Sequence, residues 1–505
     1  MRRSQAVSLP ATDSMGGLRV FLGVAATLVI LGCLTAAVYA GVSRGIDELV
    51  LIATGAAGLF VVALPLLATK RFSVVEPMMY VLMVVLIGFT LKTVYVVFAD
   101  TPRAQELIRF GRAPSFFLDG AFWTLIGLIS LVAGYVLSGV RVPLERFNAF
   151  QSDHWDPGRV WFATAVMAAI GIASTVLYVQ LMGITFSDLN SLSAKRYYEI
   201  EGADTAYGTL GYVVWGARFT EYAAYVLYTY IASKRLSMAS WRGVLFAVLL
   251  TAAIIIPFVA NSRQSAALVP INIIILSILI RGRLNTRVAG TVVVVVLVGF
   301  VTMTALRQNR ADTIQSSLMS SGVVEEIVGS RHFNDFSRTA HILAAVPDKI
   351  DYKYGSTFVA WVVAPIPRVI WKNKPFLGIG KEVATDAFGY TDRRGVPPGF
   401  LAEIAINFGV WAIPLFMFLA GAGLKVLYLS FAPILSTKKG ALLYVMVVFP
   451  STFSLLNNEV TVMVTRSLVS ALPFLALFLF FRPRASRRAH AARAARLRAA
   501  NLSYR

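Results

Sequence analysis

The chain has 505 residues, of which 57% are hydrophobic and only 14% are charged, and its mean hydropathy is +0.69. Soluble domains carry about 25% charged residues, so this composition excludes an ordinary soluble protein. The formal charge of +21 comes from 47 basic and 26 acidic residues. The basic residues lie between apolar runs, which favours a role in membrane orientation over nucleic-acid binding. The single cysteine, Cys33, excludes an intrachain disulfide.

Apolar runs of about 17–25 residues recur along the chain, and each is long enough to cross a bilayer as a helix. Backbone groups in lipid must be satisfied internally, so we interpret these runs as helices of an all-α polytopic membrane protein. The first run is longer than a signal-peptide core and is taken as a retained helix. We predict about twelve transmembrane helices, at 18–40, 49–68, 77–98, 118–140, 160–183, 209–232, 243–261, 264–280, 287–306, 403–427, 440–456 and 460–481.

Basic residues in the short loops predict the orientation of these helices, because cytoplasmic loops are enriched in lysine and arginine. Placing the N-terminal segment 1–17 in the cytoplasm puts every basic short loop on the same side. The tail 482–505 also lies inside, and its eight arginines suit anionic lipid headgroups. Both termini are therefore predicted to be cytoplasmic. The loops that support this orientation contain Lys70 and Arg71, Arg141 and Arg146, Lys234 and Arg235, Arg281 and Arg283, and Lys438 and Lys439.

Residues 307–402 separate the helices predicted in 18–306 from those predicted in 403–481. A structureless loop of this length is uncommon, so we expect one large extracytoplasmic loop that folds as a small helical cap. Within it, residues 330–346 could form an amphipathic helix. Residues 354–366 are apolar enough to lie on the membrane or to re-enter it.

Charged side chains inside a bilayer are costly and are functional candidates by default. Under the predicted topology they all fall in the outer half of their helices, which favours a polar cavity that opens to the outer face. Arg218 and Glu221 are three residues apart on one helix and could pair, for structural or functional reasons. The full set is Lys92, Arg218, Glu221, Glu403 and Arg466, with Arg263 at an outer helix junction.

The long loop contains further arginines and lysines that the topology does not explain. Arginine binds phosphate and carboxylate through a planar fork, so arginines beside an outer cavity suggest an anionic ligand, and a lipid-linked diphosphate fits. His332 lies beside Arg331 and could accept a proton from an attacking hydroxyl, although a structural role is the alternative. The basic candidates of the loop are Arg331, Arg338, Arg368, Lys372 and Lys374.

Several motifs are absent from the sequence. It has no D-x-D pair for a metal-bound sugar nucleotide, no Walker A pattern, no G-x-S-x-G and no H-E-x-x-H. We therefore expect metal-independent chemistry without a cofactor, in which arginines stabilise the charge of the leaving group.

Three segments resemble the Wzy-type polymerases of bacterial O-antigen and exopolysaccharide repeat units. The first is the run 354–358 (Y-G-S-T-F), followed by I-P-R and W-K-N-K-P within 366–375. The second is the run 399–409, G-F-L-A-E-I-A-I-N-F-G. The third is the Ser262-Arg263 turn, which resembles an S-R element of the wider polymerase and ligase superfamily.

The resemblance implies a glycosyltransferase with a GT-C-like fold in the bacterial inner membrane. It would transfer a growing glycan from undecaprenyl diphosphate to an incoming lipid-linked repeat on the outer face, and a chain-length regulator is a candidate partner. The resemblance assigns outer-loop arginines to the diphosphates. The candidate catalytic residues are Arg263, Arg331, His332, Arg368 and Glu403, and the candidate substrate-binding residues are Arg218, Arg338, Lys372, Lys374 and Arg466.

Three alternatives stay open. An O-antigen ligase is disfavoured because the H-S/T-x-G-L-Y element of ligases is absent. Another GT-C enzyme would use a lipid monophosphate sugar and an acid in the first outer loop, where Asp47 and Glu48 lie. A flippase or transporter would also suit twelve helices with both ends inside, but no internal duplication is visible.

Overall fold

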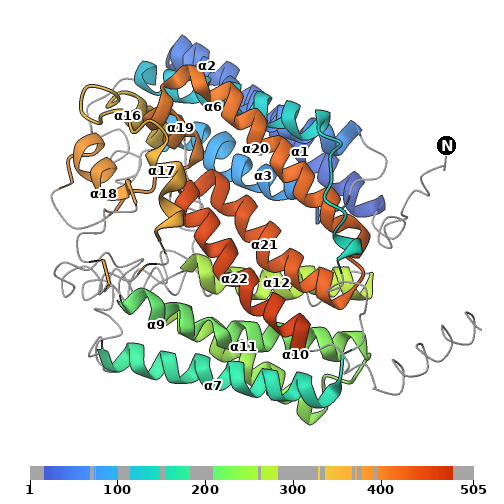
Figure 1. Cartoon of the computed structure of the whole chain (residues 1–505). Coiled ribbons are helices and arrows are strands. Elements are labelled where there is room, and N and C mark those ends of the chain that lie inside the picture. Colours follow the sequence, from blue (N-terminus) through green and yellow to red (C-terminus); the bar gives the residue numbers. More distant parts are fainter. Residues whose placement is uncertain are drawn as a thin grey trace, which may run out of the picture.

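The computed structural model describes residues 16–68, 73, 75–99, 114–147, 155–181, 209–259, 263–282, 328–329, 336–364, 366, 370–371, 378–390 and 395–480. These residues are mostly helical and contain no strand, which confirms the predicted all-α class (Figure 1). The first half consists of α1 (Gly16–Ser43), α2 (Ile46–Ala68), α3 (Pro77–Val85), η1 (Leu86–Thr90), α4 (Leu91–Phe98), α6 (Pro114–Leu137), η2 (Leu144–Arg146), α7 (Pro157–Leu181), α9 (Thr209–Ala217), α10 (Phe219–Ser233), α11 (Trp241–Val259) and α12 (Arg263–Arg281).

The second half contains the short helices of the cap and then three long helices. The short ones are α16 (Phe336–Leu343), α17 (Ser356–Val359), η4 (Ala360–Val362), α18 (Gly380–Glu382), η5 (Val383–Ala387) and α19 (Phe400–Phe408). The rest are η6 (Val410–Ala412), α20 (Ile413–Phe431), η7 (Ala432–Ile434), α21 (Lys438–Asn457) and α22 (Val460–Phe480).

Eight helical stretches of the described residues are long and apolar enough to cross a membrane. They support a multi-pass membrane protein, because such helices would expose large apolar surfaces in water. The largest difference from the predicted bounds is in the helix expected at 403–427, which lies at Val410–Ile434. The eight are Gly23–Ser43, Ile46–Ala68, Pro77–Phe98, Ser115–Leu137, Pro157–Leu181, Val410–Ile434, Lys438–Asn457 and Val460–Phe480.

Three of the other four predicted transmembrane helices are not among these eight stretches, and the fourth lies outside the described residues, so the count of twelve stays a prediction. The run 209–232 is interrupted at Arg218, between α9 and α10. The runs 243–261 and 264–280 correspond to α11 and α12, whose apolar stretches are shorter. The run 287–306 lies outside the described residues.

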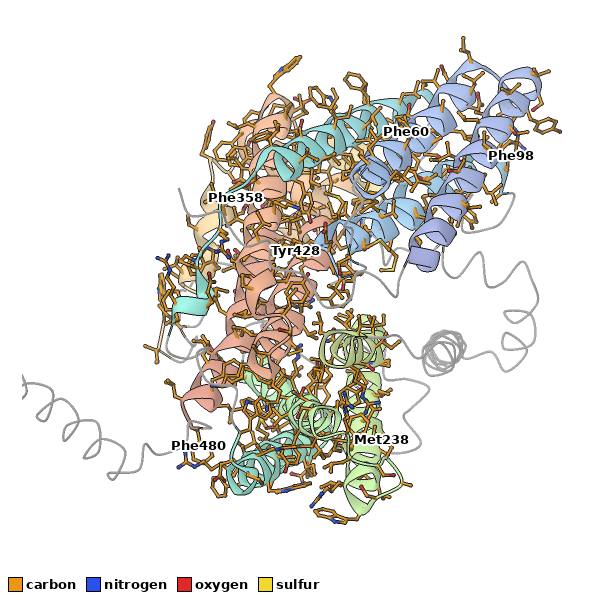
Figure 2. All side chains as sticks on the ribbon, turned by 90° about the vertical axis from the view of Figure 1, so that its right-hand side faces the viewer. Phe60, Phe98, Met238, Phe358, Tyr428 and Phe480 are labelled. Atoms are coloured by element: carbon orange, nitrogen blue, oxygen red, sulfur yellow. The ribbon has the colours of Figure 1, made fainter. Side chains whose placement is uncertain are left out.

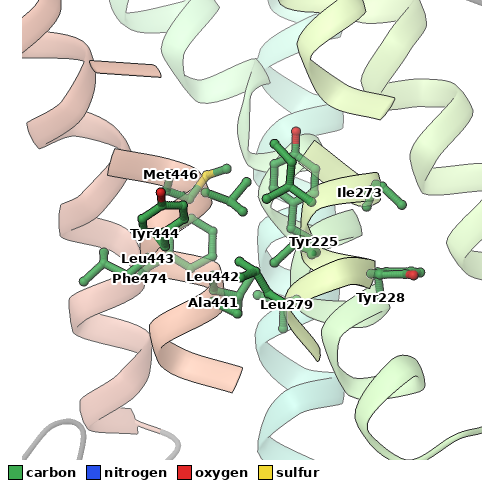
Figure 3. Packing of buried hydrophobic residues seen from close by; sticks show 14 of the residues in the cluster. Tyr225, Tyr228, Ile273, Leu279, Ala441, Leu442, Leu443, Tyr444, Met446 and Phe474 are labelled. Carbon is green, nitrogen blue, oxygen red and sulfur yellow. The ribbon is translucent and has the colours of Figure 1, made fainter. Parts of the chain in front are cut away.

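Two groups of helices share α21 as their central element (Figure 1). One apolar core is formed by residues of α1, α2, α3, α4, α6, α16, α19 and α20. The other is formed mainly by residues of α7, α10, α11, α12, α21 and α22. Figure 2 shows Phe60 and Phe98 in the first group and Met238 in the second, with Tyr428 between them. Of the apolar window in α21, 83% is buried, so this helix is enclosed by protein rather than by lipid. Figure 3 shows its side chains Leu442 and Tyr444 in the second core.

The ends of helices that the basic loops placed on one side do lie together. Tyr135 Oη donates to Glu76 Oε2 at 2.9 Å, which links the end of α6 to the start of α3. The amide of Val142 donates to Ser430 Oγ at 2.8 Å, beside the end of α20. This arrangement agrees with the predicted alternation of the helices. Which side faces the cytoplasm stays a prediction.

The cap contains a small apolar core of its own. Residues of α16, of the turns after it, of η5 and of α19 pack together, so the described part of the long loop is folded and rests on α19. Helix α16 lies within the region 330–346, where an amphipathic helix was expected. Its close packing on α6 needs Gly120, because a Cβ there would lie 2.6 Å from both Ala340 Cβ and Phe336 O.

Glycines also allow α6 and α20 to approach backbone to backbone, as small residues do between membrane helices. A Cβ at Gly421 would lie 1.9 Å from the carbonyl oxygen of Leu131, whereas a Cβ at Gly423 meets nothing within 4 Å. The two glycines therefore form a matched pair on one helix.

We predict that Gly421→Ala destabilises the protein by about 3 kcal/mol, because the clash is with backbone and must separate the helices. Gly423→Ala should instead raise stability by up to about 1 kcal/mol through helix propensity. Melting temperatures of the purified protein in detergent measure both changes. Equal shifts in the two variants would show that α6 and α20 do not pack in this way.

Candidate functional site

Two segments that carry the family resemblance are joined by hydrogen bonds. Thr357 of the Y-G-S-T-F run donates through Oγ1 to Glu403 Oε1 at 2.6 Å. Asn407 Nδ2 donates to the same Thr357 Oγ1 at 2.7 Å, and Asn407 Oδ1 accepts from the amide of Gly355 at 2.8 Å. Thr357 is thus hydrogen-bonded to both Glu403 and Asn407, and these bonds fix α17 against α19.

Backbone conformations that favour glycine set the ends of this arrangement. Gly355, with φ of +85°, precedes α17, and Gly409, with φ of +82°, follows α19. Only glycine adopts such angles without strain, so Gly355 fixes where α17 begins and Gly409 fixes where α19 ends. Gly409 also explains why the membrane-crossing stretch begins at Val410 rather than at residue 403: it separates the predicted helix into α19 and α20.

Glu403 lies outside the eight candidate transmembrane stretches and is fully buried. Its second carboxylate oxygen, Oε2, accepts from the amide of Val460 at 2.8 Å, at the start of α22. Burial raises the pKa of Glu403 from its usual 4.5 to about 7, although the hydrogen bonds from Thr357 and Val460 oppose this shift. Both oxygens are occupied and enclosed, which favours a role in holding three segments together.

The connection between α21 and α22 supplies further groups that the sequence analysis missed. Thr461 Oγ1 donates to the carbonyl of Thr357 at 2.8 Å. Glu459 is 5% exposed, and its Oε2 accepts from the amide of Ile379 at 3.1 Å. A signal did exist: the polar run Asn457-Asn458-Glu459 separates two long apolar runs by only three residues.

Arg218 and Glu221 form the ion pair that their spacing suggested, with Arg218 Nε 3.3 Å from Glu221 Oε2. They lie at the start of α10, in the second group of helices. The Arg218 side chain is 28% exposed and that of Glu221 is 6% exposed, so the pair is mostly enclosed.

Arg466 lies on α22 at the same level as Arg218. Tyr222 Oη donates to Ser470 Oγ at 3.1 Å, and each arginine precedes one of these two residues by four positions. The helices run in the same direction, because the far ends of both approach the start of α7: Tyr230 through Trp161, and Phe480 through Arg159. Four residues of a helix rise about 6 Å, so Arg218 and Arg466 both lie about 6 Å from this hydrogen bond, toward the same end of the α10–α22 contact.

The cap reaches this same end of the membrane helices. Ala364, just after η4, is fully buried and packs against Trp215 of α9, one turn before Arg218. Helix η4 also contacts α22. The arginines on α22 and between α9 and α10 therefore lie near the segment 356–364, which is itself tied to Glu403.

Other candidates from the sequence have structural contacts. Arg338 of α16 is 8% exposed, and its Nη1 donates to the carbonyl of Pro397 at 3.0 Å, which holds the turn before α19. Lys92 is 1% exposed and donates to the carbonyl of Val328 at 2.8 Å. Both contacts fix loop backbone onto helices, and neither places the residue in an open cavity.

The remaining candidates lie at the start of α12 or outside the described residues. Helix α12 begins at Arg263, but the side chain of Arg263 is not among those described. Five candidates lie outside the described residues: Arg331, His332, Arg368, Lys372 and Lys374.

Within the described part of the chain, no group of three His, Cys, Asp or Glu residues could hold a metal ion. No protein-family model, curated protein or solved structure matches this chain. The geometry described above and the resemblance of the motifs are therefore the basis for a functional proposal.

We predict that Thr357→Val destabilises the protein by about 2 kcal/mol, because it leaves Glu403 Oε1 and one of the two N–H groups of Asn407 Nδ2 buried without a partner. Valine keeps the shape of threonine, so the change tests the hydroxyl alone. Thr385→Val is the control, because the Thr385 hydroxyl bonds only to the carbonyl of Lys381 at an exposed site. Thermal unfolding in detergent compares the two, and similar melting temperatures would contradict the role of Thr357.

The raised pKa of Glu403 predicts that stability depends on pH. The folded state keeps the proton up to pH of about 7, whereas the unfolded chain releases it near 4.5. The free energy of unfolding should therefore fall, by up to about 3 kcal/mol, as the pH rises from 4.5 to 7. Glu403→Gln should flatten this part of the profile, measured by thermal unfolding at pH 5, 6, 7 and 8. An unchanged slope in the variant would assign the dependence to other groups.

Proposed function

We propose that this chain is a membrane glycosyltransferase that polymerises oligosaccharide repeats carried on undecaprenyl diphosphate. It would act at the outer face of the bacterial inner membrane, with both termini in the cytoplasm. The observation that carries the proposal is the contact of Thr357 with Glu403 and Asn407, because it joins the two segments that resemble Wzy-type polymerases. The abundance of apolar helices suits a substrate that is itself lipid-linked.

The proposed reaction is a substitution at the anomeric carbon of the donor glycan. A hydroxyl oxygen of the incoming repeat forms a bond to this carbon, and the bond from the carbon to the diphosphate oxygen breaks. The lipid diphosphate leaves with the electron pair, and the hydroxyl proton passes to a base. The protein must therefore stabilise the negative charge that develops on the leaving diphosphate and supply a base that accepts the proton.

Arginines are the proposed partners of the leaving diphosphate. Arg218 and Arg466 are suited to this role because they lie at one level near the cap segment, and their guanidinium groups stay charged at any physiological pH. The resemblance adds Arg263, Arg331 and Arg368, with Arg338 behind them. Between the two candidate bases, His332 is favoured, because Glu403 is enclosed and already accepts two hydrogen bonds.

The experiment that tests the function compares the size of lipid-linked and surface glycans with and without the gene. A polymerase predicts that the ladder of chain lengths collapses to a single repeat, displayed on the outer side. Long polymer that stays on its lipid carrier would indicate a ligase. A single repeat trapped inside would indicate a flippase and would overturn the proposal.

We predict that Arg331→Ala and Arg263→Ala abolish chain elongation, and that Arg466→Ala lowers it by at least tenfold, the effect of losing a charged hydrogen bond of about 1.5–3 kcal/mol. Arg141→Ala is the control, because Arg141 is exposed, pairs with Glu145 and lies at the opposite end of the molecule. Glycan ladders from cells with equal amounts of membrane-inserted protein measure elongation. Chains of ordinary length in all three variants would refute the assignment of these arginines.

A further inference from the structure

A chain of hydrogen bonds runs from α12 to the guanidinium of Arg218. Asn272 Nδ2 donates to Tyr225 Oη at 3.0 Å, and Tyr225 Oη donates to Glu221 Oε1 at 2.8 Å. The other oxygen of Glu221, Oε2, accepts from Arg218 Nε at 3.3 Å. Each member before Arg218 is at most 5% exposed, and Tyr225 is fully buried. In Figure 3, Tyr225 lies in the core between labelled side chains of α12 and α21.

Arg218 is held on two sides by this arrangement. Its Nε faces Glu221, and the centre of its guanidinium lies 5.7 Å from the centroid of the Tyr222 ring. Its terminal nitrogens Nη1 and Nη2 have no hydrogen-bond partner among the residues that the structure describes. The side chain is 28% exposed, and its level is that of Arg466 and of the cap segment.

This geometry suits an arginine that presents two donors to an oxyanion. A guanidinium binds phosphate through two parallel N–H groups, and such binding requires a fixed plane. A flexible arginine would lose side-chain entropy on binding, whereas one whose Nε is already anchored loses less. Glu221 can serve as this anchor only while both of its oxygens accept, one from Tyr225 and one from Arg218.

We propose that Glu221, Tyr225 and Asn272 are positioning residues that fix the plane of the Arg218 guanidinium for a diphosphate. The inference rests on the proposed function, because it takes the diphosphate of the lipid-linked donor as the ligand. It adds three residues that do not contact the substrate and act through Arg218. Anchoring by Glu221 and simple charge balance are distinguishable, because they predict opposite changes in the affinity for an anion when Glu221 is replaced by glutamine.

The discriminating substitution is Glu221→Gln. If Glu221 acted only through its negative charge, its removal beside Arg218 would tighten the binding of an anion. In glutamine an NH2 donor replaces one of the two carboxylate oxygens, so Tyr225 and Arg218 can no longer each donate to an oxygen of their own, and loss of anchoring predicts weaker binding. We expect the dissociation constant for farnesyl diphosphate to rise about tenfold in Glu221→Gln and about fivefold in Tyr225→Phe.

Tyr444→Phe is the matched control for Tyr225→Phe. Tyr444 is also fully buried in the same core, and its hydroxyl donates to the carbonyl of Val75, away from Arg218. Both variants remove one buried hydroxyl and should lower the melting temperature to a similar extent. Only Tyr225→Phe should weaken the binding of farnesyl diphosphate, and neither should change the binding of farnesol, which lacks the diphosphate.

The measurement is a binding titration of the full-length protein in lipid nanodiscs, with farnesyl diphosphate and farnesol as probes. Tighter binding in Glu221→Gln, or equal affinity in Tyr225→Phe and Tyr444→Phe, would overturn the positioning role and leave the proposed function standing. Unchanged affinity in Arg218→Ala would overturn the site at Arg218. If the unaltered protein bound farnesyl diphosphate no better than farnesol, the proposed function itself would fail, and the inference with it.

Discussion

The enclosed carboxylate of Glu403 is the constraint on which the rest of this end of the molecule depends. A buried carboxylate without partners would cost several kcal/mol, so the surrounding chain must supply donors in fixed places. Thr357 supplies one from α17 and Val460 supplies another from the start of α22. Three segments that together span about a hundred residues of the chain are thereby joined at one point. If α17 or the start of α22 moved away from α19, one oxygen of this buried carboxyl group would lose its hydrogen-bond donor.

The apolar runs predict most of the helices because their signal is local: a stretch of sufficient length and hydropathy needs no partner to be recognised. The boundary at residue 403 was wrong for a reason that hydropathy cannot detect. The run 400–420 is mostly apolar, with Glu403 and Asn407 as its polar residues, but Gly409 adopts a positive φ and divides it into α19 and α20. Likewise, the interruption at Arg218 coincides with close packing, since a Cβ at Gly171 of α7 would lie 2.1 Å from Thr220 Oγ1.

The candidate site was predictable only in part. Glu403 stood out as a charge in an apolar run, and Arg218, Glu221 and Arg466 stood out for the same reason. Thr357, Asn407 and Asn272 did not, because neutral polar residues are common in helices and loops and their importance lies in long-range contacts. The bond from Thr357 to Glu403 joins residues 46 positions apart, and the bond from Asn272 to Tyr225 joins residues 47 positions apart. No periodicity in one sequence encodes such pairs.

Stability alone does not explain the chain of polar groups between α12 and Arg218. Replacing a buried ion pair by apolar residues of similar size is often neutral or stabilising, so a pair such as Arg218 and Glu221 is weak support for a purely structural role. The surrounding core offers many apolar neighbours, and an apolar pair would fit the same place. Yet the chain keeps the ion pair, extends it with Tyr225 and Asn272, and leaves the far edge of the guanidinium directed away from these partners. An arrangement that costs stability while fixing the direction of a charge is what a binding site for an anion requires.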